Sequence, residues 1–179
     1  MGRRYDPGRR QRIIDAAITV VGERGIEGLS HRSVAAVADV PLGSTTYHFA
    51  TLDDLLVAAL GQVSAECLAD MERWEREADP EVPLAEELAR VMEEWLAGDR
   101  TRLELEYELY LAALRREAVR PIAAAYLDDV AAVLARRTGD LGVARALGAL
   151  IDGLMLQILL TGRPFDREEA RVALARVTG

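Results

Sequence analysis

The sequence predicts an all-α protein with about nine helices. Apolar residues recur at the three- and four-residue spacing of amphipathic helices, and no segment alternates as a half-buried β-strand does. Breaks such as Gly25, Pro41 and Gly98 separate these helical patterns. Half of the 179 residues are apolar, which is enough for a sizeable core. We expect a small domain over residues 1–50 and a larger helical domain over residues 51–179.

The first helix is predicted from about Pro7 or Gly8 to Arg24, and Gly25 is a suitable C-cap. Its apolar residues fall on one helical stripe, which we expect to be buried. The stripe consists of Ile13, Ala16, Ala17, Val20 and Val21.

Two short helices are predicted next. Ser30 is a good N-cap for a helix that continues to about Ala38, and Pro41 prevents its continuation because the residue before a proline is pushed out of the helical region. A second helix of about seven residues, 42–49, follows after a short turn. Two short helices joined by a tight turn form a helix-turn-helix, whose second helix enters the major groove of DNA.

A long helix is predicted from Thr51 to about Ala78. Thr51 and Asp54 have the spacing of a capping box at its start. Cys67 lies on its apolar face, so we interpret this cysteine as a small core residue rather than a reactive thiol.

The ordered set of these elements over residues 9–60 resembles the N-terminal domain of the TetR (tetracycline repressor) family of transcriptional regulators. The resemblance rests on the first helix ending at Gly25, the two short helices, the Tyr47-His48-Phe49 element and the Thr51-Leu52-Asp53-Asp54-Leu55 cap. It implies a nine-helix protein whose variable C-terminal domain binds a small molecule and dimerises. The sequence departs from the common family pattern at Leu42, where lysine is frequent, and at Thr46, where an aromatic residue is frequent.

Charge is distributed unevenly along the chain, whose formal net charge is −8. Residues 1–50 hold 7 arginines against 5 acidic residues, and the remainder is strongly acidic. A basic segment ahead of a helix-turn-helix can neutralise DNA phosphates. The alternative for Arg3 and Arg4 is a solvated terminus, whereas Arg9, Arg10 and Arg12 belong to the first helix.

The predicted recognition helix provides most candidates for DNA contacts. Side chains such as serine and threonine can hydrogen-bond base edges or phosphates, and a threonine or leucine can contact a thymine methyl group. The resemblance implies phosphate contacts for Tyr47 and His48, and Arg32 and Arg9 are further phosphate candidates. For Arg32 the alternative is a solvated side chain, and for His48 a hydrogen bond within the domain. The DNA-binding candidates are Arg9, Arg32, Leu42, Gly43, Ser44, Thr45, Thr46, Tyr47 and His48, all of them expected to be exposed on the recognition helix or near it.

In the larger domain we expect helices at about 83–97, 101–116, 120–138, 141–162 and 166–177. The second of these is apolar over most of its circumference, so we expect it to be largely buried. On a helical wheel Glu106 falls on its apolar side, where an unpaired carboxylate is costly. Two interpretations stay open: Glu106 lines a ligand cavity, or it forms an internal salt bridge or lies at an exposed position. The ligand-binding candidates are Met92, Trp95, Glu106, Tyr107, Tyr110 and Asp152.

The helix predicted over 141–162 is nearly all apolar, with Gly148 and Gly153 as points of close approach. With the amphipathic segment after it, it could form a four-helix dimer interface. Its Asp152 either faces the ligand or pairs with Arg145.

The sequence disfavours other classes of protein, such as enzymes and membrane proteins. His31 and His48 are the two histidines, both in the helix-turn-helix, and no phosphate loop or nucleophile elbow is present, so we expect no enzyme, metal or cofactor. One cysteine, no apolar run of transmembrane length and no signal peptide predict a cytoplasmic protein without a membrane partner. We therefore predict a ligand-responsive regulator, most simply a repressor, that binds double-stranded operator DNA as a homodimer and a hydrophobic or cationic effector. The alternative is a helical interaction module without DNA.

Overall fold

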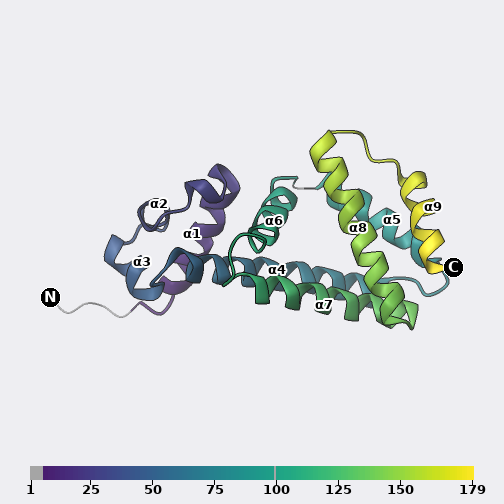
Figure 1. The fold of residues 1–179 in the computed structure, drawn as a ribbon, viewed down its shortest axis with the longest axis horizontal. Coiled ribbons are helices and arrows are strands. Elements are labelled where there is room, and N and C mark those ends of the chain that lie inside the picture. The colour runs from purple at the N-terminus through teal and green to yellow at the C-terminus, as the bar shows by residue number, and fades with distance from the viewer. Residues whose placement is uncertain (1–5, 99) are drawn as a thin grey trace. The chain divides into compact units, whose positions relative to one another are not determined.

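The computed structural model describes residues 6–98 and 100–179, and within them it contains only helices and their connections (Figure 1). The predicted all-α fold with nine α-helices is confirmed for these residues. The helices are α1 (Arg9–Arg24), α2 (His31–Val37), α3 (Leu42–His48), α4 (Leu52–Glu77), α5 (Leu84–Ala97), α6 (Arg100–Ala112), α7 (Arg120–Thr138), α8 (Leu141–Thr161) and α9 (Arg167–Thr178), with the short 3-10 helix η1 (Ile26–Gly28) after α1.

The chain divides into two compact units. Unit 1 contains Met1–Val63 and Leu105–Ala123, and unit 2 contains Ser64–Glu104 and Ala124–Gly179. Helices α4 and α6 each contribute residues to both units. We expected a DNA-binding domain over residues 1–50 and a ligand-binding domain over 51–179. The two packing units contain different residues from these two domains, and the division by function stays a prediction.

Unit 1 is built around the apolar stripe of α1, which packs against η1 and α2. All five residues predicted for this stripe are buried, as is Ile14. The start of α4 adds Leu55 and Leu56, both almost completely buried. Burial of each such side chain stabilises the fold by ~1.5–3 kcal/mol, so this apolar contact dominates over the surface ion pairs nearby.

The helix ends of unit 1 agree with the sequence. Gly25 caps α1 with φ 69° and ψ 173°, Ser30 caps α2, and the Thr51–Asp54 capping box starts α4. The Ser30 hydroxyl accepts the Ser33 N–H at 3.0 Å, while the Ser33 hydroxyl accepts the Ser30 N–H at 2.9 Å. These bonds satisfy backbone donors that a helix start leaves free.

A residue far along the chain completes the connection between α1 and α2. The Glu108 Oε1 atom of α6 accepts the backbone N–H of Ile26 at 2.6 Å. A Cβ placed on Gly25 would lie 3.0 Å from the same oxygen, so glycine is needed there both for its positive φ and for this close approach. Arg116 adds an ion pair to Asp53 at the start of α4, at 2.5 Å.

Helix α6 differs from its prediction in two respects. The helix was expected to be largely buried, but Leu109 is the one fully buried residue among those described in it, and the other apolar positions are half-buried or exposed. It also ends at Ala112 rather than near residue 116. The N–H groups of Ala113, Leu114 and Arg115 bond to carbonyls three residues earlier, which tightens the chain into turns.

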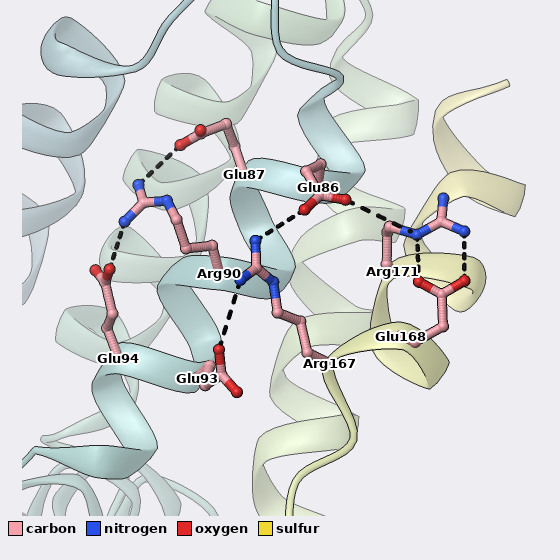
Figure 2. A network of polar contacts seen from close by, with 8 residues as sticks. All are labelled: Glu86, Glu87, Arg90, Glu93, Glu94, Arg167, Glu168 and Arg171. Atoms are coloured by element: carbon pink, nitrogen blue, oxygen red, sulfur yellow. Dashed lines mark hydrogen bonds and ion pairs between the residues drawn. The ribbon is translucent and has the colours of Figure 1, made fainter.

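In unit 2, α9 packs against α5 and α8 (Figure 1). A set of charged side chains lines the α5–α9 contact (Figure 2). Arg167 of α9 pairs with Glu86 at 2.8 Å and with Glu93 at 3.7 Å, and Arg171 approaches Glu86 at 3.9 Å. Such exposed pairs contribute little to stability, so they orient α9 while buried residues such as Leu174 hold it in place.

Helix α8 is the most apolar element of the described chain. It has 21 residues and a mean hydropathy of 1.7 in its most apolar window, of which 22% is buried. The expectation that no apolar run reaches transmembrane length is therefore wrong. By itself one such helix is weak evidence for a membrane, because a helix of a soluble protein that packs on both sides has the same composition.

Candidate nucleic-acid interface

The helix-turn-helix is formed by α2 and α3, which pack against each other. Helix α2 ends at Val37, and Asp39 in the turn has φ 50°, a left-handed conformation that aspartate adopts more readily than most residues. Pro41 precedes the first residue of α3, and its carbonyl accepts the Ser44 N–H at 2.7 Å. The turn is therefore held by backbone geometry, and it fixes the direction in which α3 leaves α2.

One face of α3 is open to solvent. Tyr47 is 82% exposed and Leu42 46% exposed, and Gly43 and Thr46 are also exposed. His48 is half-buried, and its ring meets the Tyr47 ring edge-on at 5.2 Å. A tyrosine this exposed on a packed helix has no role in the core, so its hydroxyl is available to a partner.

Two residues predicted to be exposed on α3 are buried. Ser44 is 2% exposed and Thr45 is completely buried. The Thr45 hydroxyl donates to the Leu42 carbonyl at 2.7 Å, which satisfies it inside the helix. The physical reason is that a seven-residue helix has a single inward face, and Thr45 shares it with the buried Phe49 four residues later. The expectation that the side chains of Ser44 and Thr45 are exposed is therefore wrong.

The first turns of α1 carry three arginines, one of which contacts the residue after α3. The Arg10 guanidinium stacks on the ring of Phe49 at 5.0 Å, directly after the end of α3. Arg9 is half-buried and Arg12 is exposed. Arg32 is exposed near the start of α2. Arg3 and Arg4 lie outside the described residues.

Asp6, the one acidic residue before residue 13, is the partner of two of these arginines. The Asp6 carboxylate accepts a hydrogen bond from Arg12 at 2.7 Å and lies 3.8 Å from the Arg9 guanidinium. The hydrogen bond from Arg12 lowers the pKa of Asp6, so this carboxylate is ionised at neutral pH. In the sequence, this ion pair is indicated by an acidic residue that lies within one or two helical turns of a cluster of arginines.

The ligand-binding candidates divide between the units. In unit 2, Met92 is buried on α5, while Trp95 of α5 and Asp152 of α8 are half-buried. Arg145, which the sequence offered as a partner for Asp152, pairs with Asp128 at 3.2 Å. In unit 1, three neighbouring candidates on α6 are half-buried, namely Glu106, Tyr107 and Tyr110. Their ligand contacts stay a prediction.

No group of three or more histidine, cysteine, aspartate or glutamate side chains in residues 6–98 and 100–179 is arranged to hold a metal ion. What the described residues do provide is an exposed, capped helix-turn-helix bordered by arginines. That is the geometry of a protein that docks a short helix into duplex DNA.

Comparison with known proteins agrees with a DNA-binding function. Residues 79–179 match the family model described as the tetracyclin repressor-like C-terminal domain. The HTH-type transcriptional regulator BetI of Paraburkholderia xenovorans (strain LB400) is 30% identical over 174 residues, covering 90% of this chain and 87% of BetI. Among solved structures, the multidrug binding protein EbrR complexed with ethidium is 62% identical with a TM-score of 0.88, covering 97% of this chain and 99% of that one.

A TetR-family member from Streptomyces coelicolor A3, SCO1917, is 64% identical with a TM-score of 0.82, covering 96% of this chain and 98% of that one.

The fold and the exposed helix-turn-helix define a DNA-binding transcriptional regulator. The chain belongs to the TetR family. It is a ligand-responsive regulator and not an enzyme, and repression and dimerisation are typical of the family.

Proposed function

We propose that this chain is a repressor that binds a pseudo-palindromic operator as a dimer and leaves it on binding an aromatic cation. The observation that supports the effector class is the similarity to EbrR, whose structures hold ethidium, proflavin or malachite green. Those chains are 62–63% identical to this one over nearly its whole length. The regulator acts in the cytoplasm, where its operator lies.

The DNA contacts that we propose come from the exposed face of α3 and its borders. Tyr47 and His48 bind phosphates and fix the position of the helix, since a phosphate contact carries no sequence information. Leu42, Gly43 and Thr46 face the base edges, where Leu42 and the Thr46 methyl group suit a thymine methyl group. Two further phosphate contacts come from the guanidinium groups of Arg9 and Arg32.

The effector chemistry follows from the side chains on α6. Glu106 carries a carboxylate, and Tyr107 and Tyr110 carry rings within one turn of it. An aromatic cation is attracted by a carboxylate and by the faces of aromatic rings, and a half-buried position strengthens both interactions. Trp95, Met92 and Asp152 are further candidates, offering in unit 2 an aromatic ring, a thioether and a carboxylate.

The dimer interface that we propose consists of α8 and α9. Ala146 and Ala149 of α8 are exposed, Gly153 is half-buried, and Leu160 is 77% exposed, so a stripe of small and apolar residues lies open along one side of this helix. Val172 extends the apolar surface onto α9. Small residues let helices approach closely, and the same helices of a second copy would cover this surface.

Ligand response then follows from linkage. The dimer exists in arrangements that differ in the distance between the two copies of α3, and only one arrangement matches half-sites about one turn of DNA apart. An aromatic cation that binds a non-matching arrangement more tightly lowers DNA affinity by the ratio of its affinities for the two arrangements.

Dye binding tests the effector class. Ethidium is titrated into the purified protein without DNA, and its fluorescence reports binding. We expect Glu106→Gln to weaken ethidium binding about ten-fold, since it removes a charge at a half-buried position. Glu104→Gln is the matched control, because Glu104 lies on the same helix but is exposed and paired with Arg100 at 2.7 Å.

Release of DNA is measured separately. Operator duplexes are first selected from a random pool, and malachite green is then added to the complex. Malachite green is used because ethidium and proflavin intercalate into the duplex themselves. Unchanged ethidium binding in Glu106→Gln would remove this residue from the site, and a complex that stays intact at saturating malachite green would refute the effector class.

A further inference from the structure

The Asp6 carboxylate forms ion pairs with two arginines at the start of α1. Its Oδ2 atom accepts a hydrogen bond from the Arg12 Nη2 at 2.7 Å and lies 3.8 Å from the Arg9 Nε. Its Oδ1 atom accepts the Gly8 N–H at 3.1 Å, which anchors the carboxylate at the end of the helix. A single acid thus faces two cations while its backbone contact keeps it in place.

Arg12 lies near the turn between the DNA-reading helices, and its neighbour Arg10 lies near the end of α3. The pKa of Arg12 is raised, first by its hydrogen bond to Asp6 and, as the smallest contribution, by the charge of Asp39 in the turn between α2 and α3. Arg10, two residues before Arg12, stacks on Phe49 at the other end of α3. The Arg12 side chain is 47% exposed, so its unoccupied edge is accessible to a phosphate.

Carboxylate and phosphate compete for the same donors. An arginine guanidinium binds either group through parallel N–H donors, and its geometry does not distinguish them. An exposed ion pair is weak enough to exchange its partner. When α3 enters the major groove, a phosphate near the start of α1 therefore competes with Asp6 for the Arg12 guanidinium.

We propose that Asp6 is an affinity-determining residue for DNA binding, which acts by competing with backbone phosphates for Arg12. Because phosphates carry no sequence information, this competition weakens binding to every duplex by a similar factor. It therefore lowers the occupancy of non-operator DNA without altering the ratio between operator and other sequences. The inference rests on the proposed docking of α3 and adds Arg12 to its phosphate contacts.

The test compares Asp6→Asn with Asp15→Asn. Both variants lose one negative charge on or next to α1, but Asp15 bonds to the amides of Gln11 and Gln62, at 2.8 and 3.1 Å. Asparagine at position 6 keeps an oxygen for the Gly8 N–H, and thermal unfolding of each variant checks that the fold is retained. Affinity for a duplex of mixed sequence is measured by fluorescence anisotropy over a series of salt concentrations.

We expect Asp6→Asn to raise DNA affinity up to about five-fold per subunit at low salt, corresponding to loss of one exposed ion pair. The slope of log affinity against log salt should steepen by up to about one per subunit, because the contact of Arg12 with a phosphate is then no longer shared with Asp6. Asp15→Asn should give a smaller rise and an unchanged slope.

The variant Arg12→Gln tests whether Asp6 acts through Arg12. If Asp6 acts through Arg12, adding Asp6→Asn to Arg12→Gln raises affinity no more than Asp15→Asn does, which is the effect of the lost charge alone. A larger rise in the absence of Arg12, or an Asp6→Asn rise no greater than that of Asp15→Asn with Arg12 in place, overturns the proposal. If Arg12→Gln leaves binding unchanged, Arg12 contacts no phosphate and the proposal fails, while the docking of α3 is still judged independently by substitution of Tyr47.

Discussion

Replacing Gly25 by alanine should destabilise unit 1 through two additive effects. Gly25 has φ 69° and ψ 173°, a backbone region that is almost restricted to glycine and costs any other residue ~1–3 kcal/mol. The new Cβ would also lie 3.0 Å from the Glu108 Oε1, which already accepts the Ile26 N–H. Displacing that carboxylate weakens a charge-assisted hydrogen bond worth ~1.5–3 kcal/mol. We expect a total loss of ~2.5–6 kcal/mol in the free energy of unfolding.

Urea unfolding followed by circular dichroism measures this loss, at one fixed protein concentration because dimerisation contributes to stability. Gly61→Ala is the matched control. Gly61 lies inside α4, and a Cβ there would have no atom within 4 Å, so alanine should stabilise by ~0.5–1 kcal/mol through helix propensity. The reasoning is refuted if Gly25→Ala changes the unfolding free energy by less than ~0.5 kcal/mol, the size of an ordinary surface substitution.

Four further substitutions test separate parts of the structure. Ser30→Ala removes the N-cap of α2 and should cost ~1 kcal/mol in urea unfolding; an unchanged midpoint would show that the Ser33 hydroxyl suffices as a cap. Glu108→Gln should weaken the bond to the Ile26 N–H and increase hydrogen exchange of that amide several-fold, whereas the exposed Glu104→Gln should not. Tyr47→Ala should lower DNA affinity about five-fold per subunit with stability within ~0.5 kcal/mol of the parent, and equal binding would exclude a Tyr47 contact. Ala149→Glu places a charge on the exposed side of α8 and should yield a monomer in sedimentation; a stable dimer would place the interface elsewhere.

Features decided by neighbours in the sequence could be predicted. The caps at Gly25, Ser30 and Thr51 depend on residues within four positions, so the helix ends of unit 1 follow from local chemistry. The burial of the α1 stripe follows from helical periodicity in the same way.

Features decided by distant residues could not be predicted. In α3 the one large aliphatic side chain is Leu42, which is itself exposed, so periodicity did not indicate that Ser44 and Thr45 face inward. The bond from the Ile26 N–H to Glu108 joins residues separated by 82 positions. Helical spacing alone places Glu108 on the same side of α6 as Glu104, four residues earlier, and indicates no partner for it. The exposure of α6 likewise depends on its neighbours in space, and its own composition suggested a buried helix.

The discontinuity of unit 1 limits how this regulator can exchange parts with its relatives. Leu105–Ala123 belongs to the same compact unit as the helix-turn-helix, and Glu108 and Arg116 bond to Ile26 and Asp53. A chimaera that takes the first 63 residues alone would lose these partners, and during synthesis the ribosome must reach residue 123 before the unit is complete. New operator preferences are therefore acquired more easily by point changes on α3 than by grafting the whole front of another family member.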